Sequence, residues 1–351
     1  MISTLYGFAM QLRNTAYDRG LLRARNAGVP VISVGNITAG GTGKTPVVEA
    51  LIRRILAAGI RPAMVTRGYR RESRGLFVVS DGAGNLRGVR ESGDEPYQVA
   101  NKFPEVPVIA DEKRIRGCRH AVQAFAPDLL LLDDAFQHRA VARDCDVVVL
   151  DAQVGLDGLC MLPKGRLREP LRNLARADLI LLSRCADLEQ GARLREALRS
   201  FTTAPVFSTR FTVSDFMRIL PSGEDSRTTE DTRCSAARVR GTRVLAFCGI
   251  GSPRSFERTL HDAGLDVTAQ RAFPDHHWYS EADLHTLRDD ADERGAEVLC
   301  TTEKDAMRLR ALPATAVQKA VLYPRIALEF LEGESEFFGL LGRRTGMRTL
   351  S

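Results

Sequence analysis

The sequence predicts an α/β fold: two α/β/α domains with parallel sheets, joined by a short linker. Short apolar runs rich in β-branched residues alternate with helical patterns, which is typical of parallel sheets covered by helices. A polar, turn-rich stretch at 211–240 interrupts this alternation, and a second strand–turn–helix series follows it. The length of 351 residues accommodates two domains, each with its own core.

The composition is that of an ordinary globular protein with a preference for anionic partners. The chain is 44% hydrophobic and 27% charged, which excludes a disordered or fibrous protein. Its net charge of +6 favours phosphates, nucleic acid or an acidic membrane surface. Seven scattered cysteines without C-x-x-C spacing indicate reduced thiols. The sequence has no signal-peptide or membrane-spanning pattern, so we expect a protein on the cytoplasmic side that can lie on a membrane.

The first predicted element, residues 1–26, is an amphipathic helix with a narrow polar side and a broad apolar side. An interfacial helix would bury its aromatic residues at the headgroup boundary and hold anionic lipid with its arginines. Packing of this helix on its own domain explains the pattern equally well, so both interpretations stay open. The polar residues are Ser3, Thr4, Gly7, Gln11, Asn14, Thr15 and Asp18, and the arginines are Arg13, Arg19, Arg23 and Arg25.

Residues 27–210 are predicted to form the first domain. The run VPVISV at 29–34 suits a strand buried on both faces. A glycine-rich turn and a helix follow, and Pro46 is tolerated there because the first turn of a helix has amides without helical partners. Further strands are predicted at 62–66, 129–132, 147–150 and 179–182.

The stretch 211–240, which contains PSGEDSRTTEDTR, is predicted to be a linker with a short hairpin. A second, smaller α/β domain is predicted over 241–351. Its helix at 281–294 should begin with a capping box, because Asp283 follows Ser280 by three residues. Its strands are expected at 244–248, 267–272 and 298–302.

The strongest motif is TAGGTGKT, which lies between the first strand and its helix. Glycines allow successive backbone amides to converge on phosphate groups, a lysine reaches the β- and γ-phosphates, and a hydroxyl at the helix start binds Mg²⁺. Lys44 and Thr45 supply the last two, and Thr38 stands where the consensus has glycine. The motif therefore predicts a nucleotide-binding loop of Thr38, Ala39, Gly40, Gly41, Thr42, Gly43, Lys44 and Thr45.

The second motif is LLLLDDAFQH at 129–138, an apolar strand that ends in Asp133 and Asp134. In P-loop enzymes an acidic residue at the carboxyl edge of the sheet holds Mg²⁺. A solvated pair of aspartates would fit the same letters. The phosphate loop upstream favours the metal site, and the first domain is therefore predicted to have a P-loop NTPase-type parallel sheet.

These two motifs do not separate a kinase from a nucleotide-driven switch. The run Thr302–Asp305 resembles the guanine-specific N-K-x-D element only superficially, and Ala39 stands where membrane-switch ATPases carry an extra lysine. Both differences favour a small-molecule kinase. The alternative is a P-loop GTPase or ATPase switch that acts on a protein partner. Since the sequence contains no nucleic-acid recognition module, we expect no nucleic acid partner.

Two further segments carry candidates for proton transfer. GDEPY contains Asp94 and Glu95, and FPDHHWY contains Asp275, His276 and His277. A kinase acting on a sugar hydroxyl benefits from a base that takes the hydroxyl proton. Taken alone, the histidines would fit a surface turn. The basic run KGRLREP at 164–170 could neutralise phosphate oxygens or be a solvated loop.

Together the motifs resemble the tetraacyldisaccharide 4'-kinase (lipid A 4'-kinase) family. The resemblance runs through VPVISVGNITAGGTGKTP, VTRGYRR, SGDEPYQVA, LLDDAFQHRA, LPKGRLREP, FCGIGSPRSF, FPDHHWY and TTEKDAMRL, in that order. It implies a kinase that transfers the γ-phosphate of ATP to the 4'-hydroxyl of tetraacyldisaccharide 1-phosphate, giving lipid IVA. It also implies two α/β/α domains and an N-terminal helix on the cytoplasmic face of the inner membrane. We expect no obligate protein partner.

The resemblance also assigns roles to individual residues. It implies that Lys44 and Thr45 serve the ATP phosphates and Mg²⁺, and that Asp94 and His276 form a catalytic dyad. We expect this dyad to join the two domains, with Asp94 in the first domain and His276 in the second. The remaining matches are Asp133, Asp134 and Glu169 for the metal, and Tyr69, Gln137 and Arg168 for the nucleotide.

Overall fold

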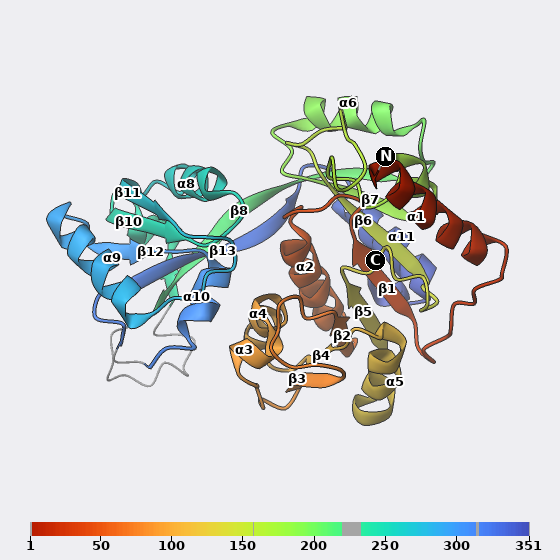
Figure 1. The fold of residues 1–351 in the computed structure, drawn as a ribbon, viewed down its shortest axis with the longest axis horizontal. Coiled ribbons are helices and arrows are strands. Elements are labelled where there is room, and N and C mark those ends of the chain that lie inside the picture. Colours follow the sequence, from red (N-terminus) through yellow and green to blue (C-terminus); the bar gives the residue numbers. More distant parts are fainter. Residues whose placement is uncertain (1, 157, 220–232, 314–315, 351) are drawn as a thin grey trace. The chain divides into compact units, whose positions relative to one another are not determined.

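The computed structural model describes residues 2–156, 158–219, 233–313 and 316–350, and the chain forms two compact units. The first unit comprises Met1–Arg87, Val99–Phe211 and Leu328–Ser351, and the second comprises Gly88–Gln98 and Thr212–Ala327. The predicted α/β fold is confirmed, because each unit has a mostly parallel sheet between helices (Figure 1).

The sheet of the first unit has the order β8-β7-β6-β1-β5-β2-β4-β3. Its pairs are parallel except β3–β4. Four central strands are buried along their full length, as expected for apolar runs between two helical layers. The strands are β1 (Val31–Gly35), β2 (Pro62–Thr66), β3 (Phe77–Asp81), β4 (Pro107–Ala110), β5 (Leu129–Asp133), β6 (Cys145–Asp151), β7 (Leu179–Ser183) and β8 (Val206–Ile219).

Helices cover both faces of this sheet. On one face α2 (Lys44–Ala57) and α11 (Glu334–Thr345) pack against alternate residues of β1, β5 and β6. On the other face lie α5 (Arg114–Phe125) and α6 (Leu188–Leu198). The alternation of side chains along each strand therefore builds two cores from one sheet. Short 3-10 helices, η1 (Leu171–Arg176) and η3 (Arg348–Leu350), complete this unit.

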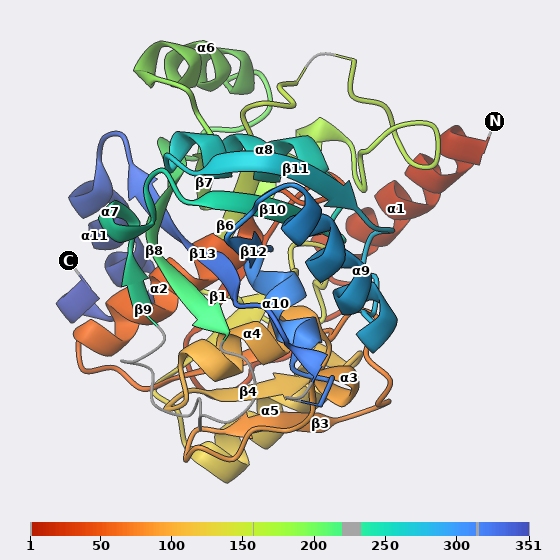
Figure 2. The same ribbon diagram turned by 90° about the vertical axis from the view of Figure 1, so that its left-hand side faces the viewer.

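The sheet of the second unit has the order β11-β10-β12-β13-β8, and β9 pairs with β8 in the antiparallel sense. Residues of β10 alternate between two apolar clusters, one shared with α8 and one shared with α9. The two helices, labelled in Figure 2, therefore cover opposite faces of this sheet. Ser280 and Asp283 form the predicted capping box. The strands are β9 (Arg233–Ser235), β10 (Arg243–Cys248), β11 (Asp266–Ala272), β12 (Val298–Cys300) and β13 (Val321–Phe330). The helices are α3 (Val89–Ser92), α7 (Ala236–Val239), α8 (Pro253–Asp262), α9 (Glu281–Glu293) and α10 (Glu303–Leu309).

The predicted domain boundaries need three corrections. The C-terminal segment Leu328–Ser351 belongs to the first unit, because aromatic side chains of α11 enter its core. Residues 212–219 are part of strand β8 rather than linker. The segment Gly88–Gln98, with α3 and the start of α4 (Asp94–Lys102), belongs to the second unit. Residues 220–232 of the predicted linker lie outside the described residues.

The N-terminal helix α1 (Ile2–Asp18) is shorter than the predicted 1–26 and packs with its polar side inward. Asn14 is 1% exposed, whereas Leu5, Phe8 and Leu12 are 69%, 67% and 62% exposed. This orientation is the reverse of an ordinary surface helix, whose apolar stripe faces the core. The polar contacts are Ser3 with Lys164, Gln11 with Arg172, Asn14 with Glu169, and Asp18 with Arg139.

Candidate active site

The phosphate loop lies where β1 ends and α2 begins. Helix α2 starts at Lys44, and Gly43 before it has a left-handed backbone with φ 81°. In the described part of the chain no side chain caps this helix start, and its first turn has no acidic residue. The positive end of the helix dipole is therefore available to an anion.

Glycine is required at position 43 for a second reason. A Cβ atom there would lie 2.3 Å from the ring of Phe211, well inside van der Waals contact. The close approach of this ring and the positive φ together exclude a larger residue without displacement of the loop.

Neighbouring strands hold the loop from outside. Asn36 donates from Nδ2 to Oγ1 of Thr42 at 2.9 Å, and Ser183 donates from Oγ to the Thr42 carbonyl at 2.8 Å. Arg184 donates to the Gly41 carbonyl. The backbone N–H of Ala39 donates to the carbonyl of Arg166 at 2.7 Å. These bonds constrain the loop through its neighbours, and a constrained loop loses less conformational freedom on binding.

Asp133 and Asp134 lie beside the loop because β5 pairs with β1, with Asp133 opposite Val34. Asp133 accepts a hydrogen bond on Oδ2 from Thr66 Oγ1 at 3.0 Å. Asp134 Oδ1 lies 3.3 Å from Lys44 Nζ and 2.8 Å from Arg168. Burial alone would raise the pKa of Asp134, but the charges of Lys44 and Arg168 outweigh it and hold the pKa below its usual range.

This donor set fits Mg²⁺. The hydroxyl of Thr45 is in the first turn of α2, and the carboxylates of Asp133 and Asp134 stand at the end of the adjacent strand. Mg²⁺ prefers such oxygen ligands and usually keeps waters and phosphate oxygens as its other ligands. The described residues contain no group of three His, Cys, Asp or Glu side chains placed for a metal, and a site of this kind does not need one.

The environment of Glu169 does not support the predicted metal-ligand role. Its side chain is fully buried, and both carboxylate oxygens already accept hydrogen bonds. The donors are Asn14 at 2.6 Å, Asn173 at 2.8 Å, Gln137 at 2.9 Å, and Arg176 at 3.0 and 3.2 Å. Burial would raise the pKa of Glu169, but Arg176 and these hydrogen bonds keep it below its usual range. Gln137, which was predicted to bind nucleotide, therefore helps to hold Glu169 in place through a hydrogen bond.

Tyr69 lies on an open, arginine-rich surface of the first unit. Its side chain is 58% exposed, and the guanidinium of Arg70 lies 5.5 Å from the centre of its ring. The adjoining hollow is lined by Arg67, Gly68, Tyr69, Arg70, Arg71, Ser73, Arg74 and Glu112. Such a surface suits an anionic ligand, in keeping with the predicted nucleotide region.

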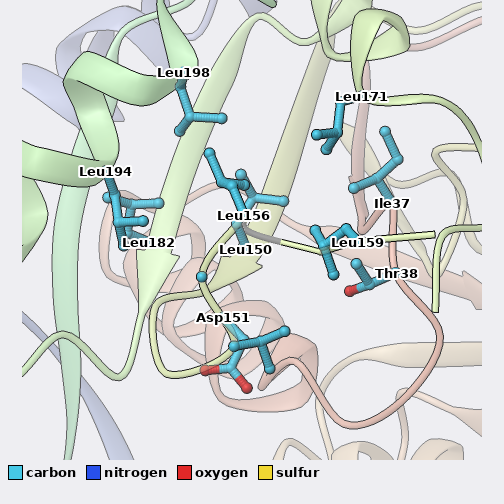
Figure 3. Close-up of a pocket in the computed structure, with 12 residues that line it drawn as sticks. Ile37, Thr38, Leu150, Asp151, Leu156, Leu159, Leu171, Leu182, Leu194 and Leu198 are labelled. Atoms are coloured by element: carbon cyan, nitrogen blue, oxygen red, sulfur yellow. The ribbon is translucent and has the colours of Figure 1, made fainter. Parts of the chain in front are cut away.

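An apolar cavity lies on the other side of Thr38 (Figure 3). Leucines from β6, β7, α6 and the loop after β6 point into it, among them Leu150, Leu182 and Leu194. Its void of about 10 Å³ is near the lower limit for one water molecule. The leucines thus pack against one another, and this cavity belongs to the core beneath the loop.

Asp94 and His276 form a hydrogen-bonded pair in the second unit. Nδ1 of His276 lies 2.9 Å from Oδ2 of Asp94, and the carboxylate is 4% exposed. His276 has a left-handed backbone, φ 62°, and its N–H donates to the carbonyl of Gly249 at 2.9 Å. A positive φ at a non-glycine residue is strained and is typical of functional positions.

The prediction that Asp94 lies in the first domain is wrong. Both members of the pair belong to the second unit, because α3 and the start of α4 pack against α10. Val89 and Tyr97 join Met307, Tyr323 and Trp278 in one apolar cluster. A segment inserted between two strands of the first unit thus supplies one half of the pair.

Two charged residues that received no role from the sequence, Arg308 and Lys304, support Asp94. Arg308 is 2% exposed, with Nε 3.4 Å from Asp94 Oδ2 and Nη1 3.1 Å from Asp305. Lys304 forms an ion pair with Glu95. Burial favours the neutral acid, but the hydrogen bond from His276 and the charges of Lys304 and Arg308 lower the pKa of Asp94 from 3.8 to about 2.

The sequence indicated only indirectly that residues of α10 (Glu303–Leu309) contact Asp94. TTEKDAMRL belongs to the matched motifs, and Asp305 and Arg308 are three residues apart on α10, so they share one helix face. The pairing of that face with Asp94 depends on contacts across more than two hundred positions of sequence.

The fold and this site define a P-loop nucleotide-binding protein with a separate Asp–His pair, an arrangement suited to phosphotransfer. The family profile of tetraacyldisaccharide-1-P 4'-kinase (LpxK) matches residues 1–344. The chain therefore belongs to the tetraacyldisaccharide 4'-kinase family.

Individual relatives agree with this assignment. The tetraacyldisaccharide 4'-kinase of Chlorobaculum parvum is 40% identical over 95% of this chain and 91% of that protein. The protein of the same name from Anaeromyxobacter sp. (strain Fw109-5) is 42% identical over 92% of this chain and 84% of that protein. A crystal structure of LpxK from Aquifex aeolicus in complex with ATP has 32% identity and a TM-score of 0.76, covering 98% of this chain and 97% of that one.

Proposed function

We propose that this protein transfers the γ-phosphoryl group of ATP to the 4'-hydroxyl of tetraacyldisaccharide 1-phosphate, giving lipid IVA. Its family and the names of its relatives support the reaction, and ATP is bound in the related Aquifex structure. The observation that carries the proposal is the buried Asp94–His276 pair. A nucleotide switch needs only the phosphate loop, whereas transfer to an alcohol also benefits from a base.

The phosphate loop performs the nucleotide half of the reaction. Its amides and Lys44 would hold the β- and γ-phosphates, and Arg168 stands beside Asp134 to add positive charge. Thr45, Asp133 and Asp134 would hold Mg²⁺, which neutralises phosphate charge when bound. Lys44 forms an ion pair with Asp134. When nucleotide binds, part of this ion pair would be replaced by contacts from Lys44 to the phosphates.

The pair in the second unit performs the acceptor half. Because Asp94 is ionised, its Oδ2 accepts a hydrogen bond from Nδ1–H of His276, and this leaves Nε2 as the basic nitrogen. His276 takes the proton of the sugar hydroxyl as phosphoryl transfer proceeds, and Asp94 stabilises the imidazolium that forms. Arg308 and Lys304 keep Asp94 ionised throughout.

We further propose that the protein works at the cytoplasmic face of the inner membrane. A substrate with four acyl chains stays in the bilayer, and the outward apolar side of α1 offers Leu5, Phe8 and Leu12 to it. In the described part of the chain, every helix is too short or too polar to cross a membrane. A peripheral attachment through α1 therefore fits the lipid substrate.

Incubation with labelled ATP and tetraacyldisaccharide 1-phosphate tests the reaction. We expect a doubly phosphorylated lipid from the wild-type protein and almost none from Lys44→Ala or His276→Ala. Hydrolysis of nucleotide without labelled lipid, stimulated by a protein partner, would instead support a P-loop switch. Near-normal turnover by His276→Ala alongside an inactive Lys44→Ala would refute the role of the dyad.

A vesicle assay tests the membrane site. Replacing Leu5, Phe8 and Leu12 by serine should weaken binding to vesicles that contain anionic lipid and lower activity on long-chain substrate. Unchanged vesicle binding by this variant, with its fold intact by circular dichroism, would rule out the apolar side of α1 as the attachment surface.

A further inference from the structure

A chain of hydrogen bonds connects the N-terminal helix to the phosphate loop within the first unit. Asn14 of α1 donates from Nδ2 to Oε2 of Glu169 at 2.6 Å. Gln137 donates from Nε2 to Oε1 of Glu169 at 2.9 Å and to the carbonyl of Asn36 at 2.9 Å. Asn36 in turn donates from its side chain to Thr42 in the loop. Five residues thus join the inward side of α1 to the nucleotide-binding loop.

The centre of this chain is fully buried and permits only one orientation of Asn14. Glu169 is 0% exposed, and an ionised carboxylate can only accept hydrogen bonds. The amide NH₂ of Asn14 must therefore face Glu169, which leaves Asn14 Oδ1 buried without a donor among the described residues. A buried polar atom without a partner is costly, so packing alone does not explain an asparagine here.

Backbone hydrogen bonds also connect the segment that contains Glu169 to the start of the phosphate loop. The N–H of Arg168 donates to the carbonyl of Ile37 at 2.8 Å, and Thr38 forms an antiparallel bridge with Leu167. The segment that ends in Glu169 therefore runs alongside the start of the loop, and Arg168 within it holds Asp134. A shift of Glu169 would move both the loop and its acidic partner.

We propose that Asn14 and Glu169 are positioning residues that couple the docking of α1 to the shape of the phosphate loop, so that α1 helps to set the affinity for ATP. The proposal rests on the proposed function in one respect, namely that the loop binds ATP. It gives the two sides of α1 different tasks. The outward apolar side serves the lipid surface, and the inward polar side serves the nucleotide.

Equilibrium binding of a fluorescent ATP analogue to the full-length protein, without lipid, tests the coupling. Asn14→Ala should weaken binding about tenfold, since a hydrogen bond to a charged group is lost. Asn14→Asp should weaken it more, because it sets a second carboxylate against Glu169. Leu12→Ser is the matched control on the same helix, and it should leave nucleotide affinity unchanged while weakening vesicle binding.

A double-mutant comparison separates positioning from simple loss of stability. If Asn14 acts through Gln137, the variant Asn14→Ala/Gln137→Ala should bind the analogue no more weakly than Gln137→Ala alone. In steady state the Michaelis constant for ATP should rise, and kcat and the constant for lipid should stay near wild type. A merely structural role would lower the melting temperature without this selective change.

Unchanged nucleotide affinity in folded Asn14→Ala, or strictly additive effects in the double variant, would overturn the inference. Its failure is distinct from failure of the proposed function. A wild-type protein that binds the analogue but does not phosphorylate the lipid would refute the kinase assignment and leave the coupling intact.

Discussion

Replacement of Asp94 by asparagine should slow catalysis strongly by reversing the polarity of one hydrogen bond. Oδ1 of Asp94 accepts the N–H of Glu95 at 2.9 Å, and Oδ2 faces Nδ1 of His276 at 2.9 Å. In Asp94→Asn the amide oxygen is needed by the Glu95 N–H, so the NH₂ group must face His276. Nδ1 then has to accept, and the ring proton moves to Nε2. The nitrogen that should take the substrate proton is no longer basic.

The magnitude of the catalytic effect follows from the role of the base. General-base catalysis contributes about 10²- to 10⁴-fold, so kcat should fall by that factor. The affinity for ATP should stay near wild type, because the nucleotide loop belongs to the first unit and both residues of the pair belong to the second. Burst and single-turnover measurements with labelled ATP would show whether the chemical step itself has slowed.

The same substitution should also lower stability, with a defined dependence on pH. The pKa of Asp94 is lowered from 3.8 to about 2, which corresponds to about 2 kcal/mol of stabilisation. Because the folded value lies below the unfolded one, this contribution is present above about pH 4 and is lost as the pH falls toward 2. The difference in unfolding free energy between wild type and Asp94→Asn should therefore shrink as the pH falls from about 4 toward 2.

The neighbouring His277–Asp283 pair provides a matched control. Its atoms Nε2 and Oδ2 are 3.2 Å apart, and the carboxylate caps α9. Asp283→Asn makes the same chemical change at the partner of His277, the residue next to His276, and we expect wild-type turnover with a stability loss of about 0.5–1 kcal/mol. The reasoning fails if Asp94→Asn keeps turnover within about threefold of wild type, or if both variants lose turnover equally.

Three further substitutions test the rest of the site. Lys44→Ala should weaken ATP binding about tenfold to a hundredfold, measured by calorimetry, because a charge-assisted contact to phosphate is lost; unchanged affinity would contradict the loop assignment. Arg308→Met should lower the free energy of unfolding, measured in urea, by about 3–5 kcal/mol. The reason is that Asp94 and Asp305 stay buried without the cation that they share. A change below about 1 kcal/mol would show that these ion pairs do not stabilise the fold. Gly43→Ala should reduce both stability and ATP affinity, because its Cβ meets Phe211 and its φ is positive; Gly59→Ala, with a positive φ and open space, is its control for the cost of φ alone.

The sequence predicted those parts of the fold that depend on local pattern. The strand at 62–66 matches β2, and those predicted at 129–132 and 179–182 end within one residue of β5 and β7. These strands are buried on both faces, so their apolar runs are continuous and easily found. Strands β8 and β13 were missed, because their burial changes along their length and they carry charged residues.

The residues of the candidate site also divide into those that a local pattern predicts and those whose contacts depend on the tertiary structure. The phosphate loop is a contiguous motif whose glycines, lysine and threonine each have a local reason to be there, and its place between β1 and α2 is as predicted. Glu169 and Gln137 were assigned to metal and nucleotide on resemblance. Their burial and mutual hydrogen bonds appear only when α1, β5 and the loop before η1 come together.

By itself the sequence determined the α/β class and the position of the glycine-rich loop, because strand runs and glycine turns are specified by near neighbours. The tertiary structure decided which unit holds Asp94, which cations keep it ionised, and which side of α1 faces inward. Those outcomes depend on contacts between residues far apart along the chain, such as the 182 positions that separate Asp94 from His276. A charged or polar side chain reveals its role only when burial and its partner are known, since both decide whether its charge is stabilised.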